Sequence, residues 1–250
     1  MKYFFSAICL ILTNPIFSQN SYSDYSSNQK EVIFYDHFDN NANAWWIGNN
    51  ADCSGVIEGG SYILEWKGET PIWYSYKGIQ LDISKDFEVE ASIKQIAGAT
   101  SNLFGIIFNK SENHESAFII NVDNSAVVYS EKRGQERTFL KPGGEVNPQI
   151  SVKTDFNKLT IRRVNGEFQF YVNEVFLKSG FISDFASSSF GFQIWYKSRI
   201  AVDFLKVSYL KKLPSEIISS NPVVENRTTP ILASDIDTDV PVVAKQNTDA

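Results

Sequence analysis

Aromatic side chains with polar neighbours are the residues of this sequence that best match a known chemistry. Flat aromatic rings bind the apolar faces of sugars, while amides and charged groups bind sugar hydroxyls. The candidate ligand-binding residues are Trp73, Tyr129, Arg133, Gln193, Trp195 and Arg199. These residue types together predict carbohydrate recognition. The alternative, that the bulky rings fill the core of the fold, stays open.

Two of the tryptophans are expected on one accessible face. In residues 190–196, alternation places Phe192, Ile194 and Tyr196 on the buried side of a strand, so that Gln193 and Trp195 face the other way. The same alternation exposes Trp73 if its neighbours Ile72, Tyr74 and Tyr76 are buried. We therefore expect Trp73 and Trp195 on the same concave sheet.

A carboxylate pair would instead indicate glycoside hydrolysis, which uses two acidic side chains flanking the scissile bond. Glu88 and Glu90 share one face of a predicted strand, but no third acidic residue follows and Lys94 continues that face. This pattern predicts a solvated strand surface, and we expect no catalytic residue there. His37 and His114 lie far apart and no nucleophile elbow is present, so neither a catalytic triad nor a zinc site is expected.

A cluster of oxygen donors near residue 40 allows a weak metal hypothesis. Asp36, Asp39 and Asn40, followed by Asn41, offer carboxylate and amide oxygens of the kind that calcium prefers. The same residues are typical of a tight turn. No other cofactor is expected, and a structural calcium ion remains an open alternative to the turn.

Strands must position all of these side chains, because no stretch of the sequence shows a sustained helical period. Residues 61–67 and 86–96 alternate apolar and polar side chains, and 103–108 is almost entirely apolar, as in a strand covered on both faces. Many short strands with turn-rich links predict an all-β fold of two packed antiparallel sheets. A jelly-roll β-sandwich is the expected architecture.

The clearest local signal is a hairpin within residues 158–178. Asn165–Gly166 suits a type I′ turn, in which both central residues have positive φ. A two-residue turn there predicts three cross-strand pairs that match in polarity: Leu159 with Val172, Ile161 with Phe170, and Thr160 with Tyr171. This agreement between turn and register supports the strand assignment.

Several segments resemble one family of sandwiches. FYDHFDNNANAWWIGNN and GVIEGGSYILEWKG look like its opening strands, and LTIRRVNGEFQFYVNEVFLKSG with FGFQIWYKSRIAVDFLKVSYL is similar to its closing strands. The family is the concanavalin A-like lectin/glucanase superfamily, and the closest pattern is that of bacterial 3-keto-disaccharide hydrolase-like and laminin-G-like modules. Glu174 departs from the usual Gly, and Leu205 from the usual Asp. The resemblance implies the fold and leaves the function open.

The two ends of the chain differ from its centre in amino-acid composition. Lys2 followed by an apolar run too short for a bilayer predicts a signal peptide over residues 1–19, and hence an extracytoplasmic protein with no transmembrane segment after cleavage. Residues 20–30 read as a flexible lead-in, 31–210 as the sandwich domain and 211–250 as a disordered tail. Whether short apolar pairs in that tail dock on a partner stays open.

The net charge and the cysteine content exclude some classes of partner and of covalent cross-link. The formal charge is −6 and becomes −7 once Lys2 leaves with the signal peptide, which argues against a nucleic-acid partner. Cys53 is then the only cysteine, so no internal disulfide is possible. We expect a secreted, non-catalytic module that binds carbohydrate or another cell-surface component. The alternatives are a 3-keto-glycoside or glycan hydrolase and a protein-interaction module.

Overall fold

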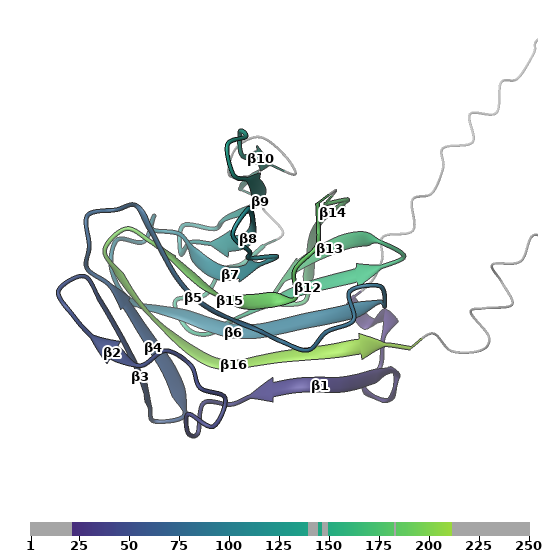
Figure 1. The fold of residues 1–250 in the computed structure, drawn as a ribbon, viewed down its shortest axis with the longest axis horizontal. Helices are drawn as coiled ribbons and strands as arrows, with labels where there is room; N and C mark the ends of the chain where they lie inside the picture. The colour runs from purple at the N-terminus through teal and green to yellow at the C-terminus, as the bar shows by residue number, and fades with distance from the viewer. Residues whose placement is uncertain (1–21, 140–144, 147–149, 183, 212–250) are drawn as a thin grey trace, which may run out of the picture. The chain divides into compact units, whose positions relative to one another are not determined.

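The computed structural model describes residues 22–139, 145–146, 150–182 and 184–211, and these residues form two packed antiparallel β-sheets (Figure 1). The all-β sandwich expected from the sequence is therefore confirmed. The predicted signal peptide and, apart from Lys211, the predicted tail lie outside the described residues. Within the described part, no helix is long or apolar enough to cross a membrane.

The larger sheet has nine strands, with β1 pairing to the second half of the long strand β16. Its order is β14 (Val175–Gly180), β13 (Glu167–Val172), β12 (Asn157–Val164), β6 (Phe87–Ala97), β16 (Ser198–Leu210), β4 (Ser61–Trp66), β3 (Cys53–Glu58) and β2 (Gly48–Asn49), and β1 spans Lys30–Asp36. Two 3-10 turns, η1 (Tyr22–Asp24) and η2 (Ser27–Gln29), precede β1.

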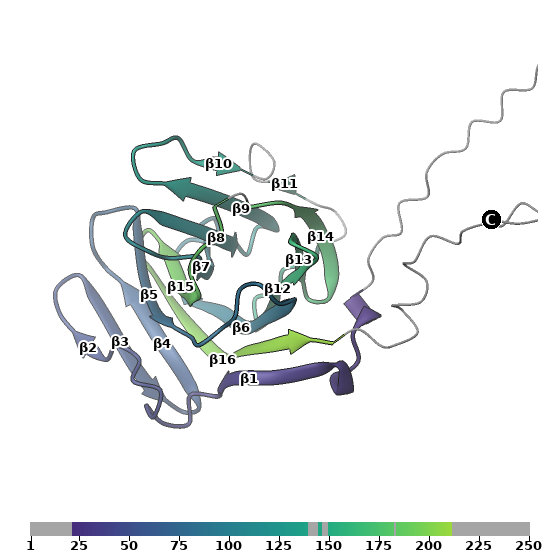
Figure 2. The same cartoon turned by 45° about the vertical axis from the view of Figure 1, so that its right-hand side comes forward.

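The smaller sheet has seven strands, with β11 pairing to β9. Its order is β10 (Thr138–Phe139), β9 (Ser125–Lys132), β8 (His114–Ile120), β7 (Phe104–Phe108), β15 (Ser189–Trp195) and β5 (Ile72–Gly78), and β11 spans Glu145–Val146. β5 is thus an edge strand, and one of its sides has no strand partner in this sheet. Figure 2 shows it beside β15, above the β2–β4 end of the larger sheet.

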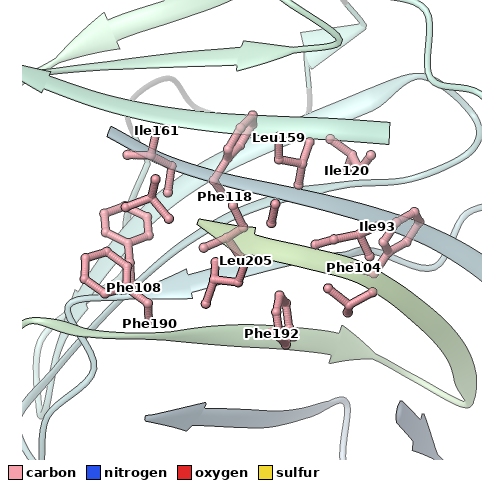
Figure 3. Close-up of a cluster of buried hydrophobic side chains, with 14 of the residues drawn as sticks. Ile93, Phe104, Phe108, Phe118, Ile120, Leu159, Ile161, Phe190, Phe192 and Leu205 are labelled. Carbon is pink, nitrogen blue, oxygen red and sulfur yellow. The ribbon is translucent and has the colours of Figure 1, made fainter. Parts of the chain in front are cut away.

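The core lies between the two sheets and consists mainly of phenylalanine and branched aliphatic side chains. Alternation in β6 and β12 directs every second residue inward, as with Val89 and Ile161, which are fully buried. Figure 3 shows the middle of this core, where Phe104, Phe108 and Phe118 of the smaller sheet meet residues of the larger one. Burial of this apolar surface is the main force that holds the sheets together.

The predicted hairpin is present with the expected register. Asn165 and Gly166 have φ values of 51° and 85°, and Leu159 faces Val172 as predicted. At the next turn, Glu174 has a φ of 69°, in the position where the family usually has Gly. A side chain with a Cβ is strained in that conformation, which explains why Gly is usual there.

Two sequence-based expectations on the outer face of the larger sheet are wrong. Glu88 and Glu90 were expected in solvent, but they are only 1% and 4% exposed. Residues 22–30 were expected to be flexible, but they form η1, η2 and the start of β1 and lie over these carboxylates: the Tyr22 hydroxyl donates to Glu90 at 2.7 Å. The sheet is covered here by a segment that is distant in sequence.

The covered carboxylates are neutralised by basic side chains. Arg162 contacts Glu88 at 2.7 Å with both side chains fully buried, and Lys158 contacts Glu90 at 2.8 Å. Burial by itself raises the pKa of Glu90, but hydrogen bonds from Lys158 and Tyr22 and the nearby positive charges outweigh it and lower the pKa to about 2. We call residues 22–30 together with these ion pairs the N-terminal strap.

Candidate functional site

Three tryptophans form a stack at the β5 edge of the sandwich. Trp66, the last residue of β4, lies parallel to Trp73 of β5, with ring centroids 6.0 Å apart and an angle of 5° between the planes. Trp46, in the loop before β2, meets Trp73 edge-on at 5.6 Å. These contacts link β5 of the smaller sheet to β4 and to the loop before β2 of the larger sheet.

Glycines make room for this stack. A Cβ on Gly55 would lie 2.9 Å from the Trp46 ring, and one on Gly68 would lie 2.3 Å from the Trp66 ring. Both distances are too short for a real Cβ atom. Any residue other than Gly at position 55 or 68 would therefore require the neighbouring indole ring to move. The positions of the indole rings are therefore determined in part by residues that have no side chain.

Trp46 and Trp73 of this stack line an open cavity of about 360 Å³, which we call the aromatic cleft. The lining residues are Trp46, Asn50, Cys53, Trp73, Tyr74, Ser75 and Tyr76. Trp46 and Tyr76 are 40% and 44% exposed, so their rings are accessible from solvent. None of the lining side chains is acidic or basic, and Cys53 is buried as expected for a lone small residue.

Hydrogen bonds hold the cleft in shape. The Tyr62 hydroxyl donates to the backbone carbonyl of Trp46 at 2.6 Å, and it lies 2.9 Å from the Ser75 hydroxyl. Because Tyr62 uses its single proton on Trp46, Ser75 is the donor in the second bond. Burial raises the pKa of Tyr62 to about 12, which keeps this proton in place at neutral pH.

A polar network lies next to the cleft, on the outer face of the smaller sheet. Gln193 Nε2 donates to the Tyr129 hydroxyl at 2.8 Å, and that hydroxyl lies 3.2 Å from Glu115 Oε1. Lys110 donates to Glu115 at 2.9 Å and lies over the Tyr74 ring at 4.6 Å. Tyr74 belongs to both the network and the aromatic cleft, so the two form one continuous surface.

Cation and ring contacts complete the network. The Arg137 guanidinium lies 4.2 Å above the Tyr129 ring and 5.5 Å from that of Trp195, and it contacts Glu131 at 2.7 Å. Burial and the adjacent Glu115 charge raise the pKa of Tyr129 above its ordinary value, so its hydroxyl stays protonated. The charged groups of the network are paired with one another, as Lys110 with Glu115 and Arg137 with Glu131, whereas the buried Trp195 Nε1 has no hydrogen-bond partner among the described residues.

Three of the predicted ligand-binding residues gather on this outer face: Tyr129, Gln193 and Trp195. Tyr129 and Gln193 are fully buried beneath the network, and Trp195 is half-buried. Arg133 and Arg199 lie elsewhere. Arg133 is an exposed partner of Glu112, and Arg199 is in β16 of the other sheet.

The expectation that Trp73 and Trp195 share a face is wrong. Trp73 pairs with Ile194, and Ile72 pairs with Trp195, so adjacent residues point to opposite sides of the sheet. Trp73 packs against the core while Tyr74 and Tyr76 face outward. Tyr196 was expected to be buried but is 54% exposed, because β15 ends at Trp195 and the chain turns there with a φ of 56°.

No local sequence pattern indicated several of the residues in this site. Lys110, Glu115 and Arg137 lie in polar segments without a recognisable pattern. Glu115 and Arg137 contact Tyr129 directly, and Lys110 is linked to it through Glu115. Trp46 lies in a loop, so strand alternation does not assign its side chain. In the structure Trp45 is 3% exposed and Trp46 is 40% exposed.

The residues of the calcium hypothesis form a hydrogen-bonded turn. Asp36 is 5% exposed, and its carboxylate accepts hydrogen bonds from Trp45 Nε1 at 2.7 Å and Asn43 Nδ2 at 2.8 Å. Asn40 accepts from the backbone of Ala42 at 2.8 Å. Among the described residues, no group of three or more histidine, cysteine or acidic side chains is placed to hold a metal ion. Asp36 and Asn40 thus form part of a hydrogen-bonded turn, and calcium binding there stays a prediction.

Comparison with known proteins identifies the fold. No family model matches the sequence, and no curated protein matches it. Among solved structures, a Bacillus subtilis protein of unknown function with a galectin-like fold matches 75% of this chain and 100% of its own, with a TM-score of 0.55 and 8% identity.

Two further structures have the same fold. Bacillus licheniformis β-glucanase matches 73% of this chain and 99% of its own, with a TM-score of 0.51 and 10% identity. The CBM2 module of the evolved Dit of Lactobacillus casei BL23 phage J-1 matches 74% and 98%, with a TM-score of 0.51 and 7% identity. At these identities the likeness shows the fold alone, which is a galectin-like, concanavalin A-like jelly-roll sandwich.

Proposed function

We propose that this protein is a secreted, non-catalytic module that binds carbohydrate through the aromatic cleft. The observation that carries the proposal is the cleft itself, an open cavity in which exposed indole and phenol rings lie beside an amide and a hydroxyl. Aromatic rings with a few fixed polar groups are the surface that a sugar requires. The fold is shared with a β-glucanase and a CBM2 module, which supports the same ligand class.

The charge distribution favours binding over hydrolysis. Glycosidases need one carboxyl group that is protonated or free to act as a nucleophile. Glu115 and Glu131, which are adjacent across β8 and β9, are each paired with a cation at 2.9 Å and 2.7 Å. The finer family resemblance, to 3-keto-disaccharide hydrolase-like or laminin-G-like domains, remains a prediction.

A glycan array probed with the chain from residue 20 onward tests the proposal. We expect the wild type to bind a subset of glycans, and the Trp46→Ala and Tyr76→Ala variants to lose about ten-fold in affinity for the same glycans. Tyr35→Ala is the matched control, since Tyr35 is 42% exposed on β1, away from the cleft.

Two results would contradict the proposal. Absence of wild-type binding to every glycan would exclude carbohydrate recognition and favour a protein-interaction module. Release of reducing sugar from a bound glycan by the wild type would show a hydrolase, and binding at the cleft would then be substrate binding.

A further inference from the structure

A second hollow lies close to the aromatic cleft. It has a volume of about 380 Å³ and is formed where three connections meet: β4 to β5, β6 to β7, and β15 to β16. Its polar and aromatic lining residues are Glu69, Thr70, Asn102, Tyr196 and Lys197. We call this hollow the loop pocket, and nothing in the proposed function accounts for it.

Tyr196 presents its ring to solvent in an uncommon backbone conformation. Its φ is 56°, a region that bulky residues rarely adopt, and its backbone N–H donates to the Pro71 carbonyl at 2.7 Å. The side chain is 54% exposed. A strained residue that displays an aromatic ring at a pocket motivates a functional hypothesis, because strain of this kind is concentrated at functional sites.

Polar groups surround this ring. Asn102 Nδ2 donates to the Ser198 hydroxyl at 2.8 Å and to the Lys197 carbonyl at 3.3 Å, which leaves Oδ1 as the acceptor for a ligand hydroxyl. Lys197 and Glu69 contact each other at 2.6 Å and are both exposed. The lining therefore offers donors and acceptors with no net charge.

The aromatic cleft and the loop pocket adjoin each other through the tryptophan stack. Trp66 Nε1 donates to the Thr70 carbonyl, which borders the loop pocket, at 2.7 Å, and the same indole stacks on Trp73 of the cleft. Thr70 and Trp73 are three residues apart, so their Cα atoms are separated by at most about 11 Å. A chain of a few linked rings is long enough to contact both hollows.

We propose that the aromatic cleft and the loop pocket are successive subsites for a single neutral oligosaccharide chain. The inference rests on the proposed function and adds the ligand class. Trp46 and Tyr76 hold one part of the chain, and Tyr196, with Asn102 beside it, holds another. Charged glycans are disfavoured because the cleft lacks charged side chains and the charges of the loop pocket cancel.

Calorimetric titration with oligosaccharides of increasing length tests the two-subsite arrangement. The probes are cello- and laminari-oligosaccharides from disaccharide to hexasaccharide, added to the chain from residue 20 onward. We expect wild-type affinity to rise with length. Tyr196→Asn, chosen because Asn tolerates positive φ, should lower hexasaccharide affinity about ten-fold and leave disaccharide affinity unchanged.

Comparison of these variants distinguishes failure of the second subsite from failure of carbohydrate binding at the aromatic cleft. Trp46→Ala should weaken both short and long ligands, and Tyr35→Ala neither. If Tyr196→Asn binds the hexasaccharide as tightly as the wild type while Trp46→Ala does not, the second subsite is refuted and the cleft stands. If the wild type binds only charged glycans on the array, the proposed ligand class is wrong.

Discussion

At the residue scale, the site depends on small residues as much as on aromatic ones. Trp46 occupies a space that only glycine leaves free, since a Cβ at position 55 would approach its ring to 2.9 Å and its backbone carbonyl to 3.0 Å. The indole cannot stay in place if that space is filled. The position of the Trp46 ring in the cleft therefore depends on Gly55, which is not itself a lining residue of the cleft.

Gly55→Ala should consequently weaken glycan binding by displacing Trp46. We expect about a ten-fold loss of affinity on the glycans that the wild type binds, with a destabilisation of about 1–3 kcal/mol from overpacking. Titration calorimetry and urea unfolding measure the two effects. Gly78→Ala is the control, because a Cβ there meets nothing within 4 Å, and unchanged binding by Gly55→Ala would contradict this role of Trp46.

At the element scale, the N-terminal strap shows how a short segment completes a sheet. Its two 3-10 turns bring Tyr22 onto Glu90, which is 68 residues away in the sequence. Burial raises the pKa of Tyr22 to about 12, while the basic residues around Glu90 lower its pKa to about 2. The strap is therefore held by a neutral phenol and an ionised carboxylate across the physiological range.

These shifts predict how stability depends on pH. A carboxylate with a lowered pKa contributes stability that is complete above its ordinary value of 4.5 and is lost as the pH falls towards 2. Tyr22 acts in the opposite direction, and its contribution is lost as the pH rises from 10 towards 12. The strap should thus be most stable between these two windows.

Glu90→Gln tests the acidic window. We expect it to lose about 3 kcal/mol at neutral pH, because it leaves basic groups without their counter-charge, and to lose less additional stability than the wild type between pH 4.5 and 2. Urea unfolding over that range measures the difference. The exposed Glu58→Gln is the control, and identical acid profiles for Glu90→Gln and the wild type would refute the strap's electrostatic role.

At the scale of the whole molecule, local patterns predicted the architecture well. The Asn165–Gly166 turn determines register through the φ values of two residues, and alternation correctly placed Val89 and Ile161 in the core. Those signals are contained within a few consecutive residues. The two-sheet sandwich could be predicted for that reason.

The candidate site could be predicted only in part. Tyr129, Gln193 and Trp195 lie together on the outer face of the smaller sheet, and their role in ligand binding stays a prediction. The pairing of β5 with β15, which local composition does not determine, places Trp73 and Trp195 on opposite faces. In the same way, burial of Glu88 and Glu90 requires the distant residues 22–30. Features that depend on long-range contacts were the ones that a single sequence did not reveal.

The most direct test of carbohydrate binding at the aromatic cleft is the response of the tryptophan indole N–H signals in an NMR titration. The chain has five tryptophans, each with one such signal. On addition of a glycan selected by the array, we expect the signals of Trp46 and Trp73 to shift and that of the buried Trp45, which donates to Asp36, to stay unchanged. Saturable shifts confined to Trp195, or no shift in any indole, would contradict binding at the cleft.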